Sequence, residues 1–598
     1  MKLTLLDWFA IFAYLAASML IGLYFRRRSS GSTEDYFVSG RDVSWWLAGT
    51  SMVATTFAAD TPLAVTGIVY FTGISGNWLW WSFLPSGMMT VFLFARLWRR
   101  SGLLTDVQFA EMRYAGKPAA FLRGFRAIYL GLLMNCIILG WVTKAMATII
   151  QTAMGFSPEA SLAICILFLI PFTGLYVSLG GLWGVLWTDV FQFVLKMGIV
   201  IAVAYYAVRG AGGMDALLAK LQEMRASTAA HSVGDATSFL PDFGAGFTAE
   251  MLWTIPVITF VVHLAVQWWA FWYPGAEPGG GGYIAQRIFS TRSEREGLLS
   301  VLWFNIAHYA VRPWPWILTG LACLVLYPGL SRGDAEASYI RAAVEHLPPA
   351  FLGVLLAGFL AAFMSTVATQ LNWGGSYLVA DFYRRFIRRD AAEPHYVFVS
   401  MYVVTPLLVI LSGVVAWMLT SITSGWENVL VIGAGTGSVY ILRWYWWRIN
   451  AWSEISAMVT SLVVSQILQQ TKPFVGNEPV VFAKTALTTT VVTTIVWVIV
   501  TYLTPPEPRE LLVRFYRQVR PHATGWAPIA AECGDVPPTR DLGANLAAWI
   551  LGCIMIYATL FGTGKLLLGE PGMGAGLLAL AGITGAMLYR DITRRVAA

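Results

Sequence analysis

The sequence predicts an all-α polytopic membrane protein, and three observations support this fold class. Of the 598 residues, 57% are hydrophobic and only 12% are charged, which is about half the charged fraction of a soluble protein. Apolar runs of about 20 residues, long enough for a helix to cross the hydrocarbon core of a bilayer, recur along most of the chain. Short arginine clusters separate many of these runs. Lipid is therefore the solvent for most of this chain.

The net charge of +7 does not indicate a nucleic-acid-binding protein. The basic residues lie between apolar runs, where they set the orientation of a membrane protein. A nucleic-acid-binding domain would gather them on one polar face. We expect the lipid bilayer and a small-molecule solute as partners, and we expect neither nucleic acid nor an obligate protein partner.

The apolar windows predict fifteen membrane-spanning helices. Each window is long enough to cross the bilayer or to form a broken span within it. In chain order the predicted helices are 4–25, 46–73, 75–98, 121–151, 157–178, 181–208, 247–273, 297–328, 348–383, 395–420, 425–447, 453–470, 479–503, 543–568 and 573–590.

The basic clusters predict the orientation of these helices. If the N-terminus is outside, the clusters should follow the odd-numbered helices, because positive charge is retained on the cytoplasmic side. Clusters follow the first, third, seventh, ninth, eleventh, thirteenth and last helices, beginning at Arg26, Arg99, Arg287, Arg384, Arg443, Arg509 and Arg594. The pattern favours an N-out, C-in topology.

Two predicted helices contain breaks. In the second helix, residues 54–62 place hydroxyls, a carboxylate and a proline near mid-span. In the seventh, the aromatic run 268–273 gives way to Pro274 and to four glycines at 279–282. Non-helical backbone at membrane depth persists only where it lines a cavity or packs within protein. Paired breaks indicate an inverted-repeat transporter, although an unrelated proline kink and a glycine-rich loop would give the same pattern.

The ninth predicted helix carries a polar stripe. Ser365, Thr369 and Asn372 lie at positions i, i+4 and i+7, with Thr366 beside them, so their side chains share one helix face. Hydroxyl and carbonyl oxygens suit a hard cation such as Na⁺, and a broken helix offers carbonyls. Hydrogen bonds to the helix itself or to a neighbouring helix would explain the same stripe.

At these residues the sequence resembles the sodium:solute symporter family, which includes sodium/glucose, sodium/galactose, sodium/proline and sodium/sialic acid symporters. The resemblance covers roughly residues 5–505, and its motifs lie at 49–67, 187–192, 283–287 and 361–383. It implies a LeuT-like inverted repeat of five plus five helices, with one extra helix at the N-terminus and about four at the C-terminus.

The resemblance and the predicted helices together divide the chain into seven segments. The two long polar stretches among them are too short to form an independent enzyme domain. The segments are an extra N-terminal helix with a basic cytoplasmic loop (1–45), a first five-helix repeat (46–208), an extracellular loop (209–246), a second five-helix repeat (247–448), two additional helices (449–503), a cytoplasmic loop (504–542) and two C-terminal helices (543–598).

Family membership would also imply a common sodium site. By position, this site would use backbone carbonyls at the first break, a carbonyl in the ninth helix and two hydroxyls, from Ala54, Phe57, Ala362, Ser365 and Thr366. Na⁺ is the coupling ion that the resemblance implies.

A second sodium site of some relatives would fall on Asp189 and Thr369, together with Ser365. This sequence has Ala368 where a hydroxyl is expected, which puts a second sodium ion in doubt. Asp189 would then guide sodium toward the cytoplasm, or an Arg or Lys partner would give this intramembrane carboxylate a structural role.

The breaks and the aromatic residues around them predict a solute pocket. Aromatic faces stack on sugar rings or enclose cations, and Gln and Glu side chains bind hydroxyls; tryptophans in membrane proteins also form interfacial belts. Lys144 and Arg312 could hold a carboxylate or extend to the interface, and His308 and Tyr309 lie near the position that reads sugar hydroxyls in the family. The predicted pocket residues are Asp60, Thr61, Trp80, Trp81, Gln267, Trp268, Trp269, Trp426 and Glu427.

We therefore expect a sodium-coupled secondary active symporter in the cell membrane that imports a small polar solute by alternating access, with a sugar or sugar-like solute as first choice. A small carboxylate, an amino acid or proton coupling are alternatives within this class. A membrane-embedded transferase or a transporter-like sensor are alternatives outside it. The sequence contains no HExxH motif, P-loop or nucleophile elbow and no appended signalling domain, so we expect no enzymatic activity.

Overall fold

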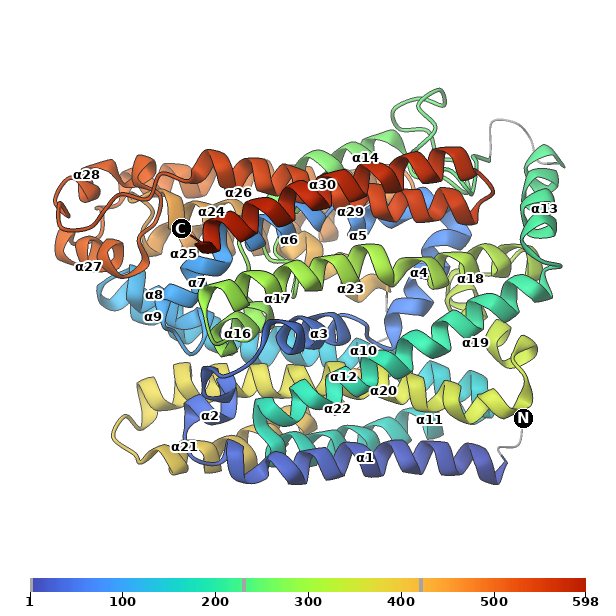
Figure 1. Ribbon diagram of the computed structural model, residues 1–598, viewed down its shortest axis with the longest axis horizontal. Helices are drawn as coiled ribbons and strands as arrows, with labels where there is room; N and C mark the ends of the chain where they lie inside the picture. Colours follow the sequence, from blue (N-terminus) through green and yellow to red (C-terminus); the bar gives the residue numbers. More distant parts are fainter. Residues whose placement is uncertain (1–3, 228–232, 419–422, 598) are drawn as a thin grey trace.

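The computed structural model describes residues 4–227, 233–418 and 423–597, and within these ranges the chain folds into helices joined by loops. Figure 1 shows the long helices lying side by side along the horizontal axis, with the N-terminus at the right end and the C-terminus at the left. Helix α13 (Met214–Ser227) stands at the right end, whereas α27 (Arg509–Val519) and α28 (Ala527–Ala530) lie at the left end. The two long polar stretches of the sequence thus lie at opposite ends of the helical bundle.

Within the described ranges, eleven helical stretches are long and apolar enough to cross a membrane, and a twelfth counts if the bent pair α3 and α4 is one span. The helices of these stretches are α1 (Leu5–Ser29), α3 (Trp45–Thr55), α4 (Asp60–Thr72), α5 (Trp78–Trp81), α6 (Leu84–Met89), α7 (Ala95–Ser101), α9 (Gly116–Ile128), α10 (Asn135–Met154), α11 (Pro158–Ile164), α12 (Ile170–Gly210), α17 (Glu294–Ile306), α18 (Pro313–Leu326), α20 (Leu352–Ser376), α21 (Glu393–Val399), α22 (Thr405–Met418), α25 (Ala451–Thr471), α26 (Glu478–Leu503), α29 (Leu542–Leu567) and α30 (Pro571–Ala597). Shorter helices outside these stretches are α14 (Val257–Val262), α15 (Trp268–Ala270), α16 (Gly282–Ser290), α23 (Thr423–Ile432) and α24 (Gly437–Tyr445).

Each of the fifteen predicted segments overlaps at least one of the described helices, but only eleven or twelve stretches of the described chain are long and apolar enough to cross a membrane. The stretch Pro158–Gly210 is 53 residues long, far more than the roughly 20 that one crossing needs. Gly181 interrupts it with a φ of +51°, so the stretch divides where the sequence separates 157–178 from 181–208. The segment 425–447 consists of two shorter helices, α23 and α24, joined through non-helical backbone. In the segment 247–273 one continuous helix runs from Val257 to Ala270, and residues 247–256 before it are not helical.

The apolar helices differ in how much of each is buried inside the protein. In the stretch Leu352–Ile387, which contains α20, 94% of the apolar window is buried, whereas in Pro571–Arg594 of α30 the buried share is 22%. Helix α20 therefore lies at the centre of the bundle, which explains why its polar stripe contacts protein rather than lipid. Helices α29 and α30 pack against each other, and lipid is the expected contact for the exposed faces of α30.

Several described helices lie where the sequence indicated only loops. The longer ones are α13, α27 and α19 (Arg332–His346), and the shorter ones are α2 (Thr33–Val38), α8 (Phe109–Arg113), α16 and α28. Helix α19 packs against α4 and buries Tyr339 and Ile340. Its charged outer face lowers its average hydropathy, which is why apolar windows do not detect it.

Helices α3 and α17 approach so closely at Gly49 that a side chain does not fit between them. A Cβ atom at this position would lie 2.5 Å from the Ser300 carbonyl oxygen of α17. We expect Gly49→Ala to reduce the stability of the protein by about 1–3 kcal/mol, since α17 must move outward. The thermal unfolding midpoint of the detergent-purified protein measures this loss. Gly198→Ala in α12, where nothing lies within 4 Å of the added carbon, should leave the midpoint unchanged or slightly higher.

Candidate functional site

The first predicted break lies between α3 and α4. Helix α3 ends at Thr55, helix α4 begins at Asp60, and their axes differ in direction by 58°. The last carbonyls of a helix lack the partners that a continuous helix would supply, so side chains from other helices can bind them. The Thr366 hydroxyl of α20 donates to the Thr55 carbonyl at 2.9 Å, which ties the break to the central helix.

The second predicted break follows α15, which ends at Ala270, and continues to α16 at Gly282. Its backbone pairs with the gap between α23 and α24. The Trp272 amide donates to the Gly433 carbonyl at 3.0 Å, and the Gly435 amide donates to the Ala270 carbonyl at 2.8 Å. The two non-helical segments therefore satisfy each other's polar groups, as backbone inside a bilayer requires.

The structure brings the predicted ligands of the common sodium site to the junction of α3 with α20. Oxygens suit Na⁺, but the side chain of Lys196 from α12 already binds two of them. Its ammonium donates to the Ala54 carbonyl at 2.7 Å and to the Phe57 carbonyl at 3.2 Å. With Lys196 in this position the oxygens do not fit a sodium ion, because an ammonium and a sodium ion cannot share them.

The two hydroxyls and the third carbonyl of this predicted site also have partners. The Ser365 hydroxyl donates to Asp189 Oδ1 at 2.6 Å. The Thr366 hydroxyl lies 3.3 Å from the Ala362 carbonyl of its own helix, in addition to its bond to Thr55. The polar stripe of α20 therefore makes hydrogen bonds to its own helix and to neighbouring helices, as the alternative explanation of the stripe expects.

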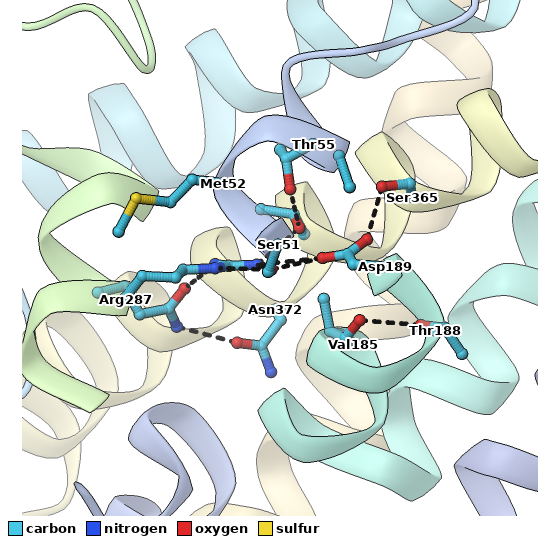
Figure 2. Close-up of polar contacts among 12 residues, drawn as sticks. Ser51, Met52, Thr55, Val185, Thr188, Asp189, Arg287, Ser365 and Asn372 are labelled. Carbon is cyan, nitrogen blue, oxygen red and sulfur yellow. Dashed lines mark hydrogen bonds and ion pairs between the residues drawn. The ribbon is translucent and has the colours of Figure 1, made fainter. Parts of the chain in front are cut away.

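The carboxylate of Asp189 in α12 joins three other helices (Figure 2). It accepts hydrogen bonds from Ser51 of α3 and from Ser365 of α20. The guanidinium of Arg287 in α16 lies 4.0 Å from its Oδ2 and donates to Thr369 at 2.8 Å. Asp189 and Thr369, the candidates for a second sodium site, thus contact a cationic side chain.

The position of Arg287 in a basic cluster of the sequence predicts a cytoplasmic residue, but the structure buries its side chain. The sequence places it in a cytoplasmic cluster that sets orientation, but its side chain is 0% exposed and donates to Ser51, to Thr369 and, at 2.7 Å, to Gln286. The sequence offered one signal of this difference. The nine-residue helix α16 begins directly after the second break, so its first turns extend into the bundle.

A cavity of about 120 Å³ lies between the two breaks. Asp60, Thr61, Trp80 and Trp426, all predicted pocket residues, line it. The Trp426 indole donates to Asp60 Oδ2 at 3.0 Å. The other oxygen, Asp60 Oδ1, is buried and has no hydrogen-bond partner among the described residues, so it can accept a hydrogen bond from a solute.

Four other predicted pocket residues lie outside this cavity. Trp81 follows Trp80 on one helical turn and therefore points away from it, against Phe561 of α29. Gln267 donates to the Leu79 carbonyl at 2.6 Å, Trp268 packs on Trp549, and the Trp269 indole donates to Ala265 in its own helix. The side chain of Glu427 lies outside the described part of the structure.

Non-helical residues after α15 line the cavity in place of the aromatic run. These are Tyr273, Pro274, Gly275 and Ala276. Arg312, a sequence candidate for holding a carboxylate, also lines the cavity, as do His308 and Tyr309, which lie near the family position that reads sugar hydroxyls. The polar and aromatic lining residues that the sequence did not indicate as solute contacts are Thr55, Thr56, Phe83, Trp141, Tyr283, Thr366 and Gln370. Because α15 ends only at Ala270, the indoles of Trp268 and Trp269 still follow the helical register, and they contact α29 and the preceding helical turn rather than the cavity.

Comparison with known proteins agrees with this architecture. The model of the sodium:solute symporter family matches residues 36–462, which is more than half of the chain. A sodium/glucose cotransporter of Vibrio parahaemolyticus is 26% identical over 496 residues, covering 78% of this chain and 86% of the relative. The sodium/sialic acid symporter SiaT of Proteus mirabilis is 24% identical, covering 77% and 88%. The high-affinity proline transporter PutP of Bacillus subtilis is 23% identical, covering 74% and 87%.

A solved structure has the same fold. An outward-open Na⁺-coupled sialic acid symporter superimposes with a TM-score of 0.67 at 20% identity and covers 85% of this chain and 99% of its own. The predicted family is confirmed by the match to its model, and Na⁺ is the coupling ion that the names of the relatives and of the solved structure give for those proteins. The chain is a polytopic membrane protein that belongs to the sodium:solute symporter family.

Proposed function

We propose that this protein is a sodium-coupled secondary active symporter that imports a small polar organic solute across the cell membrane, with a sugar or sugar-like compound as the first choice. The observation that carries this proposal is the cavity between the two helix breaks. It combines aromatic faces with a buried carboxylate oxygen, Asp60 Oδ1, that lacks a partner among the described residues. Ligand sites in transporters of this architecture lie at such breaks.

The cavity has the chemistry to bind a hydroxylated ring. Trp80 stacks on Tyr309 with ring centroids 6.1 Å apart and an interplanar angle of 18°, which leaves flat apolar surface at the cavity wall. Aromatic faces bind the C–H faces of sugar rings, while polar atoms at the edge fix their hydroxyls. Asp60 Oδ1 accepts hydrogen bonds, and Gln370 can supply both a donor and an acceptor.

We also propose the finer topology that the sequence predicts, with fifteen spans, two five-helix repeats and an N-out, C-in orientation. Two features support it. The ends of the chain lie at opposite ends of the bundle in Figure 1, as an odd number of crossings requires. The polar segment with α13 lies at the end that holds the N-terminus, and the arginine-rich helix α27 lies at the other, as the positive-inside rule expects.

Alternating access in this proposal depends on the two breaks. Helices α3 and α4 meet at the cavity, so a change in the angle between them opens or closes its wall toward one side. A bound Na⁺ supplies the driving force, since inward movement of one charge through 100 mV contributes about 2.3 kcal/mol. Coupling is reciprocal, so sodium must raise solute affinity by the factor by which solute raises sodium affinity.

A second solute class, small carboxylates and amino acids, is favoured by Arg312. Its guanidinium lines the cavity and donates to the Thr56 hydroxyl at 3.0 Å and to the Val53 carbonyl at 3.3 Å. Arginine binds carboxylates through paired hydrogen bonds. An amino acid could place its carboxylate on Arg312 and its ammonium on Asp60.

Thermal stability of the purified protein tests the proposed function. We would measure the unfolding midpoint with glucose, galactose, sialic acid, small carboxylates and proline, each in sodium chloride and in choline chloride. A solute that stabilises the protein more in sodium than in choline supports the proposal and identifies the solute class. A folded sample that no solute stabilises in either salt would count against it.

Trp80→Ala should weaken binding of the stabilising solute by about tenfold or more, since it removes one of the three indoles that line the cavity. Trp80→Phe should retain most of the affinity. Trp268→Ala is the matched control, because this indole packs on Trp549 outside the cavity, and it should leave solute affinity unchanged. Isothermal titration of each variant measures the dissociation constant. Equal losses in Trp80→Ala and Trp268→Ala would place the solute elsewhere.

A further inference from the structure

Lys196 is a buried lysine whose position neither the composition nor the motifs of the chain explain. Its side chain extends from α12 to the end of α3, where the ammonium binds the Ala54 and Phe57 carbonyls and lies 5.2 Å from the centroid of the Phe57 ring. The whole residue is 1% exposed. An ammonium this deep in a membrane protein must be held by oxygen atoms of the protein, and here these oxygens come from the first helix break.

The two carbonyls are the ones that family resemblance assigns to the common sodium ion. An ammonium and a sodium ion are both monovalent cations, and each binds carbonyl oxygens. The Ser365 and Thr366 hydroxyls, the remaining side-chain candidates for that site, donate to Asp189 and Thr55 instead. The arrangement is therefore complete with Lys196 as its cation.

The charges around Lys196 favour one cation at this position and oppose a second. Asp189, two helical turns earlier on α12, attracts the ammonium, and Arg312 repels it. Arg312 also binds the Val53 carbonyl, one residue before Ala54. The end of α3 thus holds two cationic side chains already, and a sodium ion at the Ala54 and Phe57 carbonyls would meet the repulsion of both.

We propose that Lys196 is an internal competitor of the coupling ion, so that sodium binds the common site only when the Lys196 ammonium leaves the Ala54 and Phe57 carbonyls. The proposal rests on the proposed function, because it concerns the sodium site of a symporter. On leaving, the ammonium remains near the Asp189 carboxylate of its own helix. Competition by a tethered cation lowers the apparent sodium affinity without changing the ligands of the ion.

Sodium itself is the probe for the test. The unfolding midpoint of the full-length protein in detergent is measured as sodium chloride replaces choline chloride at constant ionic strength. We expect the half-maximal sodium concentration to fall about tenfold or more in Lys196→Met. Lys196→Gln, which keeps an uncharged donor for the carbonyls, should shift it in the same direction. Lys144→Met, which removes a half-buried lysine of α10, should not shift it.

A further variant assigns any gain to the common site. Adding Thr366→Ala to Lys196→Met removes a candidate ligand and should abolish the increase in sodium affinity. The proposal is overturned if Lys196→Met and Lys196→Gln, both monodisperse on size exclusion, bind sodium no more tightly than the wild type. Solute uptake is judged separately. Failure of all uptake with a clear sodium shift would reject the proposed function alone, and uptake without the shift would reject the competition alone.

Discussion

Asp189→Asn should be among the most destabilising single substitutions in this protein. The carboxylate is 0% exposed, accepts hydrogen bonds from Ser51 and Ser365 and lies 4.0 Å from the Arg287 guanidinium. An asparagine offers one acceptor oxygen in place of two and leaves the buried guanidinium without a counter-charge. Removal of one partner from a buried ion pair costs about 3–5 kcal/mol. The unfolding midpoint and the yield of monodisperse protein measure this loss.

The double variant Asp189→Asn with Arg287→Met separates the ion pair from other causes. If the cost comes from the stranded guanidinium, removing that group should recover part of the lost stability. The exposed pair of Arg517 with Asp535, whose side chains are 52% and 61% exposed, is the control, and Asp535→Asn should change stability by less than about 1 kcal/mol. A loss in Asp189→Asn no larger than this control would refute the assignment.

Glu454→Gln should have an effect of similar size at the end of the bundle that holds α27. Glu454 of α25 is fully buried and binds two arginines: Arg126 of α9 at 3.3 Å and Arg443 of α24 at 3.2 Å. It also accepts a hydrogen bond from Tyr114. The neutral amide leaves two buried guanidinium groups with less compensating charge. We expect a loss of about 3–5 kcal/mol, measured as the shift of the thermal midpoint.

A smaller loss of stability in Glu454→Gln would have a specific explanation. Arg126 also lies 3.7 Å from Asp106, so that carboxylate could take over part of the charge. Asp106→Asn combined with Glu454→Gln should then destabilise the protein by more than the sum of the two single changes. Additive losses would indicate that the two carboxylates act independently.

Hydropathy predicted the apolar helices because the bilayer imposes their length. Every predicted segment overlaps an observed helix, although 247–273 begins before its helix, which starts at Val257, and both predicted breaks are present, after Thr55 and after Ala270. Helix α19 escaped prediction because it lies on the protein surface, where a mixed pattern of charged and apolar residues suffices. Hydropathy detects contact with lipid, and α19 is held by contact with α4.

The candidate site was less predictable than the helices, because the direction of each side chain depends on the residue at which its helix ends. Asp60, Trp80 and Trp426 line the cavity as expected, whereas Trp268 and Trp269 precede the end of α15 and make their contacts outside it. Arg287 and Arg443 belong to sequence clusters that indicate cytoplasmic loops, but tertiary packing pairs both with buried carboxylates. Charge counts along a sequence cannot separate these two environments.

The spacing of Asp189 and Lys196 in the sequence could have revealed that the two side chains lie close together. Lys196 lies seven residues after Asp189, which is two turns of an α-helix, so both side chains share one face. An intramembrane lysine at that spacing from an aspartate predicts a cation near the carboxylate. Only the bend between α3 and α4, however, determines that the ammonium meets the Ala54 and Phe57 carbonyls.

Uptake by reconstituted proteoliposomes tests transport most directly. Purified protein is placed in liposomes, and entry of radiolabelled glucose, galactose, sialic acid and proline is followed with an inward sodium gradient, and with choline in place of sodium. We expect at least one solute to accumulate above its external concentration with sodium outside, and to equilibrate at most when choline replaces it. Accumulation of no solute by liposomes that contain folded protein would contradict the proposed symport, and accumulation that is equal in choline would contradict sodium coupling.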